Sequence, residues 1–128
     1  MVVTEQIPSF EGIVEASARL KRWVGMTPLF QSELLSKAFE AEVWLKVETA
    51  TPIASFKLRG AFNALLTARE MSSLRRAVTS STGNHGQAVA FAARALGVPA
   101  DIFLPDNPNP TKRDMIAALA GDHSRRRL

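Results

Sequence analysis

The sequence predicts an α/β fold in which helices flank parallel strands. Short segments with apolar residues at period two are separated by longer segments with apolar residues at helical spacing. From residue 42 onward strands and helices are expected to alternate, so neighbouring strands can run parallel through helical crossovers. Hydrophobic residues form 46% of the 128 residues and charged residues 22%, which is the balance of a globular protein.

The first 40 residues predict two helices separated by a break. Ser9 can cap a helix that runs to about residue 23. Pro28 disfavours a helical conformation in the residue before it, so the pattern is interrupted at residues 25–29. A second, shorter helix is expected over residues 32–39.

A strand and a long helix are expected next. Val43, Leu45 and Val47 alternate with their neighbours along the chain, which is the pattern of a strand with one buried face. A loop follows, and Ser55 can cap the helix that continues to Arg69.

The second half repeats the strand–helix unit. Gly97 is placed to end one helix, and Asn109 can cap another that has Pro110 at its first position. The expected elements are strands at 77–80 and 100–104 and helices at 86–96 and 110–120.

Residues 121–128 depart from this alternation. They read Gly-Asp-His-Ser-Arg-Arg-Arg-Leu, which is polar and lacks a strand pattern, so the sequence predicts an unfinished sheet followed by an atypical tail. A frameshifted or truncated gene is one hypothesis for this tail.

Composition and charge exclude several classes of partner. The net charge is +4 and the pI about 10.1, but three of the positive charges lie in the last four residues and no basic face is focused elsewhere. The most apolar stretch, residues 88–98, is too short to cross a bilayer, and the first residues do not form a signal peptide. Cysteine is absent, which excludes thiolate metal ligands. We therefore expect a cytoplasmic protein with no metal, no membrane and no nucleic-acid partner.

Two loops that each lie between a strand and a helix could hold chemistry, because ligands bind at this edge of parallel sheets. The first leads to Lys57, in the first turn of a helix and two residues before Arg59. The positive end of the helix dipole and the neighbouring arginine both disfavour an ammonium, and so favour the neutral amine that attacks a carbonyl. On spacing alone, an ordinary surface lysine remains the alternative.

The second loop, residues 81–86, combines hydroxyls, an amide and two glycines at the start of a helix. Free backbone N–H groups at such a position suit an anion, and glycine permits its close approach. A capped turn without a ligand is the alternative. His85 is a possible base, although a histidine at a helix start without a carboxylate partner is more often structural.

Several ordered motifs resemble one enzyme family. They are residues 27–29 (Thr-Pro-Leu), 46–48 (Lys-Val-Glu), 55–61 (Ser-Phe-Lys-Leu-Arg-Gly-Ala), 81–88 (Ser-Thr-Gly-Asn-His-Gly-Gln-Ala), 98–100 (Val-Pro-Ala) and 104–105 (Leu-Pro). From about Val24 to Ala120 the chain resembles the pyridoxal-phosphate-dependent threonine/serine dehydratases. This family includes serine racemase and has the tryptophan-synthase-beta-like fold.

The resemblance implies pyridoxal 5'-phosphate as cofactor and Lys57 as the residue that carries it through its amine. Phe56 would pack beside the pyridine ring, and Asn84 would hydrogen-bond the ring hydroxyl. The implied activity is a lyase that converts threonine or serine to a 2-oxo acid and ammonia, with Lys57 taking the Cα proton. The substrate carboxylate would be held by Ser81, Thr82, Asn84 and His85, largely through backbone N–H groups.

The sequence departs from the family pattern at three places. Thr49 stands where many relatives have asparagine, and Ile53 and Ala54 stand where threonine and glycine are usual. Thr82 replaces the second serine of its loop, the residue that resembles the opposite-face acid/base of the racemases. Because the β-branch of Thr82 restricts its rotamer, we expect elimination rather than racemisation.

The resemblance also implies a division of the chain. Family members are longer and place the cofactor between two α/β domains. Residues 1–72 would begin the large domain and residues 73–120 would form most of the small one, so neither would be complete. We expect homo-oligomers of the longer parent protein.

Three interpretations follow for the chain itself. It is a dehydratase by ancestry, a catalytically inactive fragment that keeps the lysine but lacks the phosphate-binding loop, or an unrelated small anion-binding module. For the isolated chain we expect the inactive fragment rather than an active enzyme, because charge-assisted phosphate contacts normally anchor the cofactor.

Overall fold

The computed structural model describes residues 7–71, 74–121 and 124–125. The first half contains α1 (Phe10–Leu20), β1 (Leu29–Gln31), α2 (Glu33–Phe39), β2 (Trp44–Lys46) and the 3-10 helix η1 (Glu48–Ala50). The second half contains α3 (Lys57–Met71), β3 (Ala77–Ser80), α4 (Asn84–Ala95), β4 (Ala100–Phe103), α5 (Pro110–Ala120) and β5 (Ser124–Arg125).

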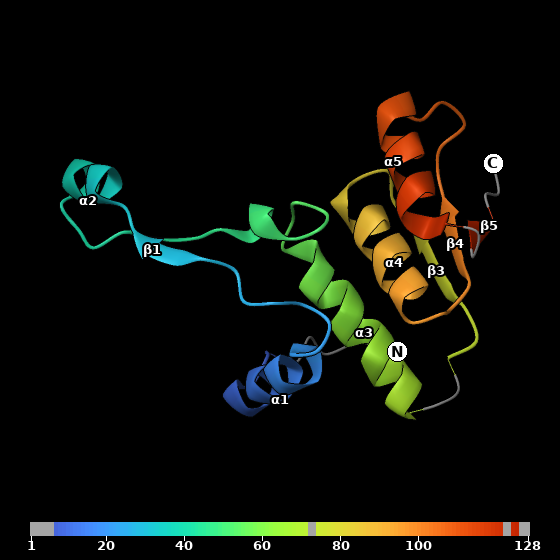
Figure 1. Ribbon diagram of the computed structural model, residues 1–128, viewed down its shortest axis with the longest axis horizontal. Coiled ribbons are helices and arrows are strands. Elements are labelled where there is room, and N and C mark those ends of the chain that lie inside the picture. Colours follow the sequence, from blue (N-terminus) through green and yellow to red (C-terminus); the bar gives the residue numbers. More distant parts are fainter. Residues whose placement is uncertain (1–6, 72–73, 122–123, 126–128) are drawn as a thin grey trace.

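The second half of the chain forms a parallel sheet. Its strand order is β3-β4-β5, and Ala77 lies opposite Ala100 in the first pair of strands. Helices α4 and α5 connect the strands and lie side by side against the sheet, with α3 beyond α4 (Figure 1). The predicted parallel α/β class is confirmed here, and strands β3 and β4 appear almost where they were expected.

The prediction that the sheet stays unfinished after α5 is wrong. Ser124 and Arg125 form β5, which pairs parallel with Ala100 and Asp101 of β4. Pairing at the end of a sheet needs only backbone N–H and C=O groups, so a polar dipeptide can supply it without any apolar alternation. The rest of the predicted atypical tail, residues 122–123 and 126–128, lies outside the described residues.

The core lies between α3 and α4. Leu58 and Phe62 of α3 are almost completely buried, and they face a run of buried small residues on α4. The Phe62 ring stacks on Trp23 at 5.5 Å and meets Phe91 edge-on at 6.2 Å, which ties the end of α1, α3 and α4 together. Small side chains such as Ala88 on α4 allow this close helix packing.

Residues 28–47 form an arm that projects away from this body (Figure 1). Within it β1 and β2 pair antiparallel, with Leu29 opposite Lys46. The sequence predicted neither β1 nor an antiparallel pair, because residues 25–29 carry only the signal of a break. The alternating face of the expected strand is confirmed, since Val43, Leu45 and Val47 are half-buried while Trp44 is exposed.

The predicted caps Ser9 and Asn109 are confirmed, and Ser32, which was not predicted as a cap, acts in the same way. The side chains of Ser9, Ser32 and Asn109 accept hydrogen bonds from backbone N–H groups in the first turns of α1, α2 and α5. Helix α4 begins at Asn84, two residues earlier than predicted, because Gly83 already has the extended conformation of a cap residue.

Gly86 is needed for the loop between β3 and α4. A Cβ atom at Gly86 would overlap the carbonyl oxygen of Ser81, whereas a Cβ at Gly60 would meet no atom within 4 Å. We expect Gly86→Ala to lower the free energy of unfolding by about 1–3 kcal/mol, as overpacking does. The matched change Gly60→Ala, inside α3, should raise it by up to about 1 kcal/mol through helix propensity. Urea denaturation of both variants checks this, and a neutral effect of Gly86→Ala would contradict the close approach.

Candidate functional site

The two candidate loops lie at the same end of the molecule. Helices α3 and α4 run side by side with their N-termini together, at the carboxyl end of strands β3 and β4 (Figure 1). Ser81 extends the strand pairing by one bond, because its N–H donates to the carbonyl of Phe103 at 3.2 Å. Helix α3 packs beside α4 and leads into β3, so its first residue, Lys57, lies at the same edge of the fold as the 81–86 loop, where ligands bind in such folds.

Lys57 combines a fixed backbone with a free side chain. It is the first residue of α3, and its N–H donates to the hydroxyl of Ser55 at 3.3 Å. Its side chain is exposed, and its Nζ lies 5.2 Å from the centroid of the Phe56 ring. An ammonium at this distance from an aromatic face is weakly attracted to it. Phe56 is itself 60% exposed, so its ring is available to a planar ligand beside Lys57.

Thr51 fixes the turn that leads into Lys57. Its hydroxyl accepts a hydrogen bond from the N–H of Ser55 at 2.9 Å and lies 3.0 Å from the carbonyls of Glu48 and Ser55. Both Thr51 and Ser55 are buried, so these hydrogen bonds are shielded from water. Ala54, inside this turn, has a φ of 50°, a conformation that suits glycine better than alanine. This positive φ fits the glycine that is usual in relatives at this position, and the structure offers no explanation for the alanine that stands here.

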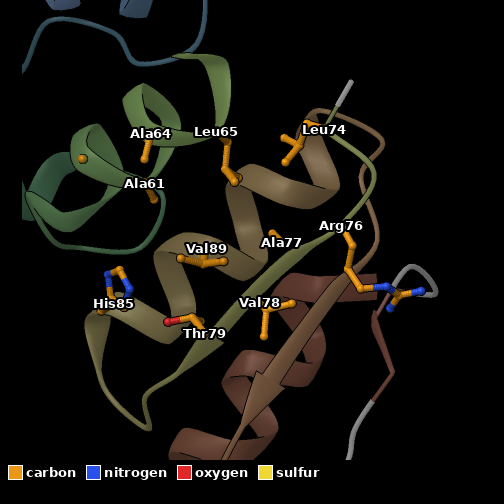
Figure 2. Close-up of a pocket in the computed structure, with 11 residues that line it drawn as sticks. Ala61, Ala64, Leu65, Leu74, Arg76, Ala77, Val78, Thr79, His85 and Val89 are labelled. Carbon is orange, nitrogen blue, oxygen red and sulfur yellow. The ribbon is translucent and has the colours of Figure 1, made fainter. Parts of the chain in front are cut away.

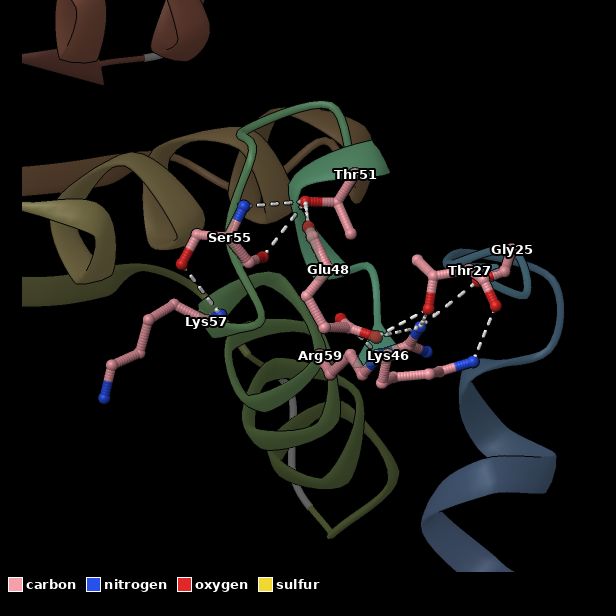
Figure 3. A network of polar contacts seen from close by, with 8 residues as sticks. All are labelled: Gly25, Thr27, Lys46, Glu48, Thr51, Ser55, Lys57 and Arg59. Carbon is pink, nitrogen blue, oxygen red and sulfur yellow. Dashed lines mark hydrogen bonds and ion pairs between the residues drawn. The ribbon is translucent and has the colours of Figure 1, made fainter. Parts of the chain in front are cut away.

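Glu48 and Arg59 form a two-pronged ion pair at the base of the arm (Figure 3). Arg59 donates to the two carboxylate oxygens of Glu48 at 2.9 and 3.0 Å, and the hydroxyl of Thr27 donates to the same carboxylate at 2.6 Å. Lys46 Nζ donates to the carbonyl of Thr27 at 2.7 Å. The Arg59 hydrogen bonds hold the pKa of Glu48 below its ordinary value of 4.5, against a smaller opposing effect of burial.

This ion pair changes the expected role of Arg59. The sequence placed Arg59 as a second cation close to Lys57, but its guanidinium is occupied by Glu48. Figure 3 shows the Lys57 side chain extending away from that network. The prediction that Arg59 acts as a second cation beside the Lys57 amine is therefore wrong, because the guanidinium of Arg59 pairs with Glu48. Of the two effects expected on this amine, only that of the helix dipole is left.

The 81–86 loop leaves the first turn of α4 open. The hydroxyl of Ser81 accepts from the N–H of Gly83 at 3.2 Å, and the cap residue Gly83 has no side chain to cover the next N–H groups. The N–H groups of a first helical turn have no partner within the helix, so they are free to bind an anion. Asn84 and His85 are exposed here.

A groove lies beside this loop, between α3, β3 and α4 (Figure 2). Its volume is about 300 Å³, and most of its lining residues are apolar. His85 and Thr79 line it together with Gly60 and Ala61, which lie one helical turn beyond Lys57. The structure therefore brings the imidazole of His85 to the first turns of α3, a neighbourhood that the sequence did not indicate.

The residues that the sequence indicates as ligand contacts lie together at one edge of the fold, but the sequence did not indicate the residues that hold them in place. Lys57, Phe56 and the 81–86 loop lie where they were expected. Glu48 and Thr51 were not predicted to act, although the Lys-Val-Glu motif that contains Glu48 was noticed. The sequence offers only an acidic residue at the end of the expected strand and an arginine eleven residues later. This combination is too common to predict the contact between Glu48 and Arg59.

These features define an α/β protein with an exposed lysine and an uncapped helix start at the same edge, and known proteins share its fold. Residues 20–124 match the family model described as "Pyridoxal-phosphate dependent enzyme". Serine racemase from Schizosaccharomyces pombe is 39% identical over 99 residues, which cover 77% of this chain and 31% of that protein. L-threonine ammonia-lyase from Thermotoga maritima is 41% identical over 97 residues, 76% of this chain and 24% of the relative. The structure of maize serine racemase superposes with a TM-score of 0.82 at 30% identity, covering 94% of this chain and 36% of that one.

The chain belongs to the pyridoxal-phosphate dependent enzyme family. It spans roughly a third or less of the length of these relatives. The predicted family, fold class and cofactor are thereby confirmed. Among the described residues no helix is long and apolar enough to cross a membrane. The same part of the chain holds no group of three histidine or acidic side chains that could bind a metal.

The residues present fit the carbonyl end of pyridoxal phosphate. Lys57 offers an exposed amine, Phe56 an exposed ring face, and Gly83 an open approach, since a Cβ there would meet only the Ser81 hydroxyl oxygen at 3.9 Å. The exposed amide of Asn84 stands at the same helix start.

The depressed pKa of Glu48 predicts a pH dependence of stability. Above pH 4.5 the ionised carboxylate gives its full contribution, which is lost as the pH falls through its lowered pKa in the folded chain. We expect Glu48→Gln to lower the free energy of unfolding at pH 7 by about 1–3 kcal/mol, and the difference from the wild type to shrink at acid pH. Urea denaturation across the pH range measures both.

The control for this prediction is Glu70→Gln. Glu70 pairs with Arg19 at 3.1 Å, but its side chain is 59% exposed compared with 18% for Glu48. Exposed pairs contribute about 0–1 kcal/mol, so this variant should change stability little. Equal losses in both variants would contradict a special contribution of the Glu48 ion pair.

Proposed function

We propose that the chain carries the lysine-bearing part of a pyridoxal-phosphate-dependent ammonia-lyase that acts on threonine or serine. The observation that supports this most is the pairing of a free Lys57 amine on a fixed backbone with the uncapped first turn of α4 at the same edge. The relatives named serine racemase and L-threonine ammonia-lyase support the same substrate class, small hydroxyamino acids.

The roles proposed for the residues are those that the family resemblance implies, and their positions at one edge of the fold support them. The open N–H groups of the 81–86 loop bind the substrate carboxylate, with the side chains of Ser81, Thr82, Asn84 and His85 around it. Phe56 and Asn84 would contact the face and the hydroxyl of the cofactor ring. Lys57 would hold the cofactor through Nζ, and its free amine would take the Cα proton of the substrate.

The bound cofactor supplies an electron sink that stabilises the negative charge left at Cα. Loss of the Cα proton and of the β-hydroxyl removes one water from the substrate. Water then adds at Cα as ammonia leaves, which gives the 2-oxo acid. The carboxylate contacts keep Cα within reach of Lys57 during these proton movements.

The division of the chain belongs to the same proposal. Residues 1–72, which include the projecting arm, would begin the large cofactor domain, and residues 73–120 would be most of the small domain. The 121–128 segment would continue the small domain at least through β5, since its backbone extends that sheet. A cytoplasmic location and a homo-oligomeric longer protein remain predictions from the sequence.

Racemisation is a second candidate, because serine racemases are among the relatives and the structural neighbours. It requires an acid/base on the face of the substrate opposite Lys57. Thr82 stands where the resemblance places that group, and it is only half-exposed. A stiff threonine hydroxyl there favours elimination over proton return. Incubation with L-serine separates the two reactions, because elimination gives pyruvate and racemisation gives D-serine.

Covalent trapping tests the proposal. We expect borohydride reduction of the purified chain with pyridoxal phosphate to give one main adduct on Lys57, which is lost in Lys57→Arg and kept in Lys112→Arg. Both changes preserve charge, so they isolate the amine, and peptide mass spectrometry locates the adduct. Scattered labelling of all lysines would contradict a formed site and would favour the inactive-fragment interpretation.

A further inference from the structure

One short segment, residues 48–51, holds the chain on both sides of Lys57. Thr51 binds Ser55, two residues before Lys57, through its hydroxyl at 2.9 Å from the backbone N. Glu48 binds Arg59, two residues after Lys57, through two hydrogen bonds of 2.9 and 3.0 Å. The lysine therefore lies between two fixed points that both originate in residues 48–51, which are η1 and the residue that follows it.

The two fixed points determine how the first turn of α3 is rotated. Residues two apart in a helix point in directions about 200° apart, so Lys57 and Arg59 leave α3 on nearly opposite sides. Figure 3 shows this arrangement, with Arg59 turned into the network and Lys57 extended away from it. Any contact that fixes the direction of Arg59 must then also fix the direction of Lys57.

The contacts of Glu48 are suited to this task. A two-pronged arginine–carboxylate pair restrains direction as well as distance, which a single hydrogen bond does not. The hydroxyl of Thr27 donates to the carboxylate of Glu48, and the carbonyl of Thr27 accepts from Lys46. Glu48 is therefore anchored through Thr27 to the base of the arm. Leu58, fully buried next to Lys57, prevents the turn from lifting away from the core.

We propose that Glu48 is a positioning residue for Lys57. Its ion pair with Arg59 sets the rotation of the first turn of α3 and thereby directs the Lys57 amine. This inference rests on the proposed function, because it takes Lys57 as the residue that carries the cofactor. Glu48 contacts neither cofactor nor substrate and acts only through Arg59.

A role limited to stability makes a different prediction from a positioning role. If Glu48 only stabilises the fold, its loss lowers the unfolding temperature but leaves the reactivity of Lys57 unchanged while the chain stays folded. If it positions Lys57, reactivity falls even in the folded chain. The measurement must therefore compare reactivity among variants at a temperature where circular dichroism shows each to be folded.

The test is the ratio of pyridoxal-phosphate adduct on Lys57 to adduct on Lys112 after borohydride reduction. Lys112, exposed on α5, serves as an internal reference within each sample. We expect Glu48→Gln to lower this ratio by about tenfold, since small displacements of a reacting group reduce rates strongly. Glu70→Gln, which breaks the other ion pair on α3, should leave the ratio unchanged. The charge-exchanged double variant, Glu48→Arg with Arg59→Glu, should restore part of it.

A second readout does not depend on the cofactor. Hydrogen exchange of the backbone amides at residues 55–60 should speed up at least fivefold in Glu48→Gln and stay unchanged in Glu70→Gln, because only the first variant frees this turn. An unchanged adduct ratio in folded Glu48→Gln, or unchanged exchange at these amides, would overturn the positioning role. Absence of a Lys57 adduct in the wild type would instead overturn the assignment of Lys57, so the two failures are distinguishable.

Discussion

The ion pair between Glu48 and Arg59 joins the base of the arm to the first turn of α3, and the geometry around Lys57 depends on it. The arm itself has little packing of its own, since α2 contains no buried residue. Charge-assisted hydrogen bonds hold its base to the body. Arg59 and Thr27 both donate to the partly buried carboxylate of Glu48, and Lys46 donates to the carbonyl of Thr27. Such bonds are stronger than neutral ones and fix direction, so a weakly packed segment can still define where a helix starts.

The topology of the second half supplies the other half of the site. Helix α4 connects the parallel strands β3 and β4 and therefore starts at their carboxyl edge, and α3, which packs beside α4 and leads into β3, presents its first turn at the same edge. The absence of a side-chain cap on α4 leaves N–H groups open there, and Gly86 lets the loop close tightly under Ser81. A lysine and an uncapped helix start thus lie at the same edge of the fold although 24 or more residues separate them in sequence. This is the arrangement that an amino acid needs when its carboxylate is held and its Cα proton is removed.

Much of this could be predicted from the sequence because the relevant signals are local. Ser9 and Asn109 cap helices through contacts only three residues long, and the alternation of Val43, Leu45 and Val47 reveals a strand without its neighbours. The antiparallel partner of that strand and the polar strand β5 could not be predicted, because both depend on backbone pairing with distant residues. The direction of Arg59 was predicted wrongly for the same reason: the carboxylate that turns it lies in another element. The groove beside His85 also depends on how three elements pack together.

The central claim is that Lys57 and the 81–86 loop form one site. The most direct test is to record amide chemical shifts of the chain, with and without reductive attachment of pyridoxal phosphate to Lys57, during titration with acetate as a carboxylate probe. We predict that attachment of the cofactor shifts the amides of Asn84, His85 and Gly86, and that acetate then shifts them further in a saturable way. Shifts confined to residues near Lys57, with the 81–86 amides unmoved by both additions, would contradict the claim.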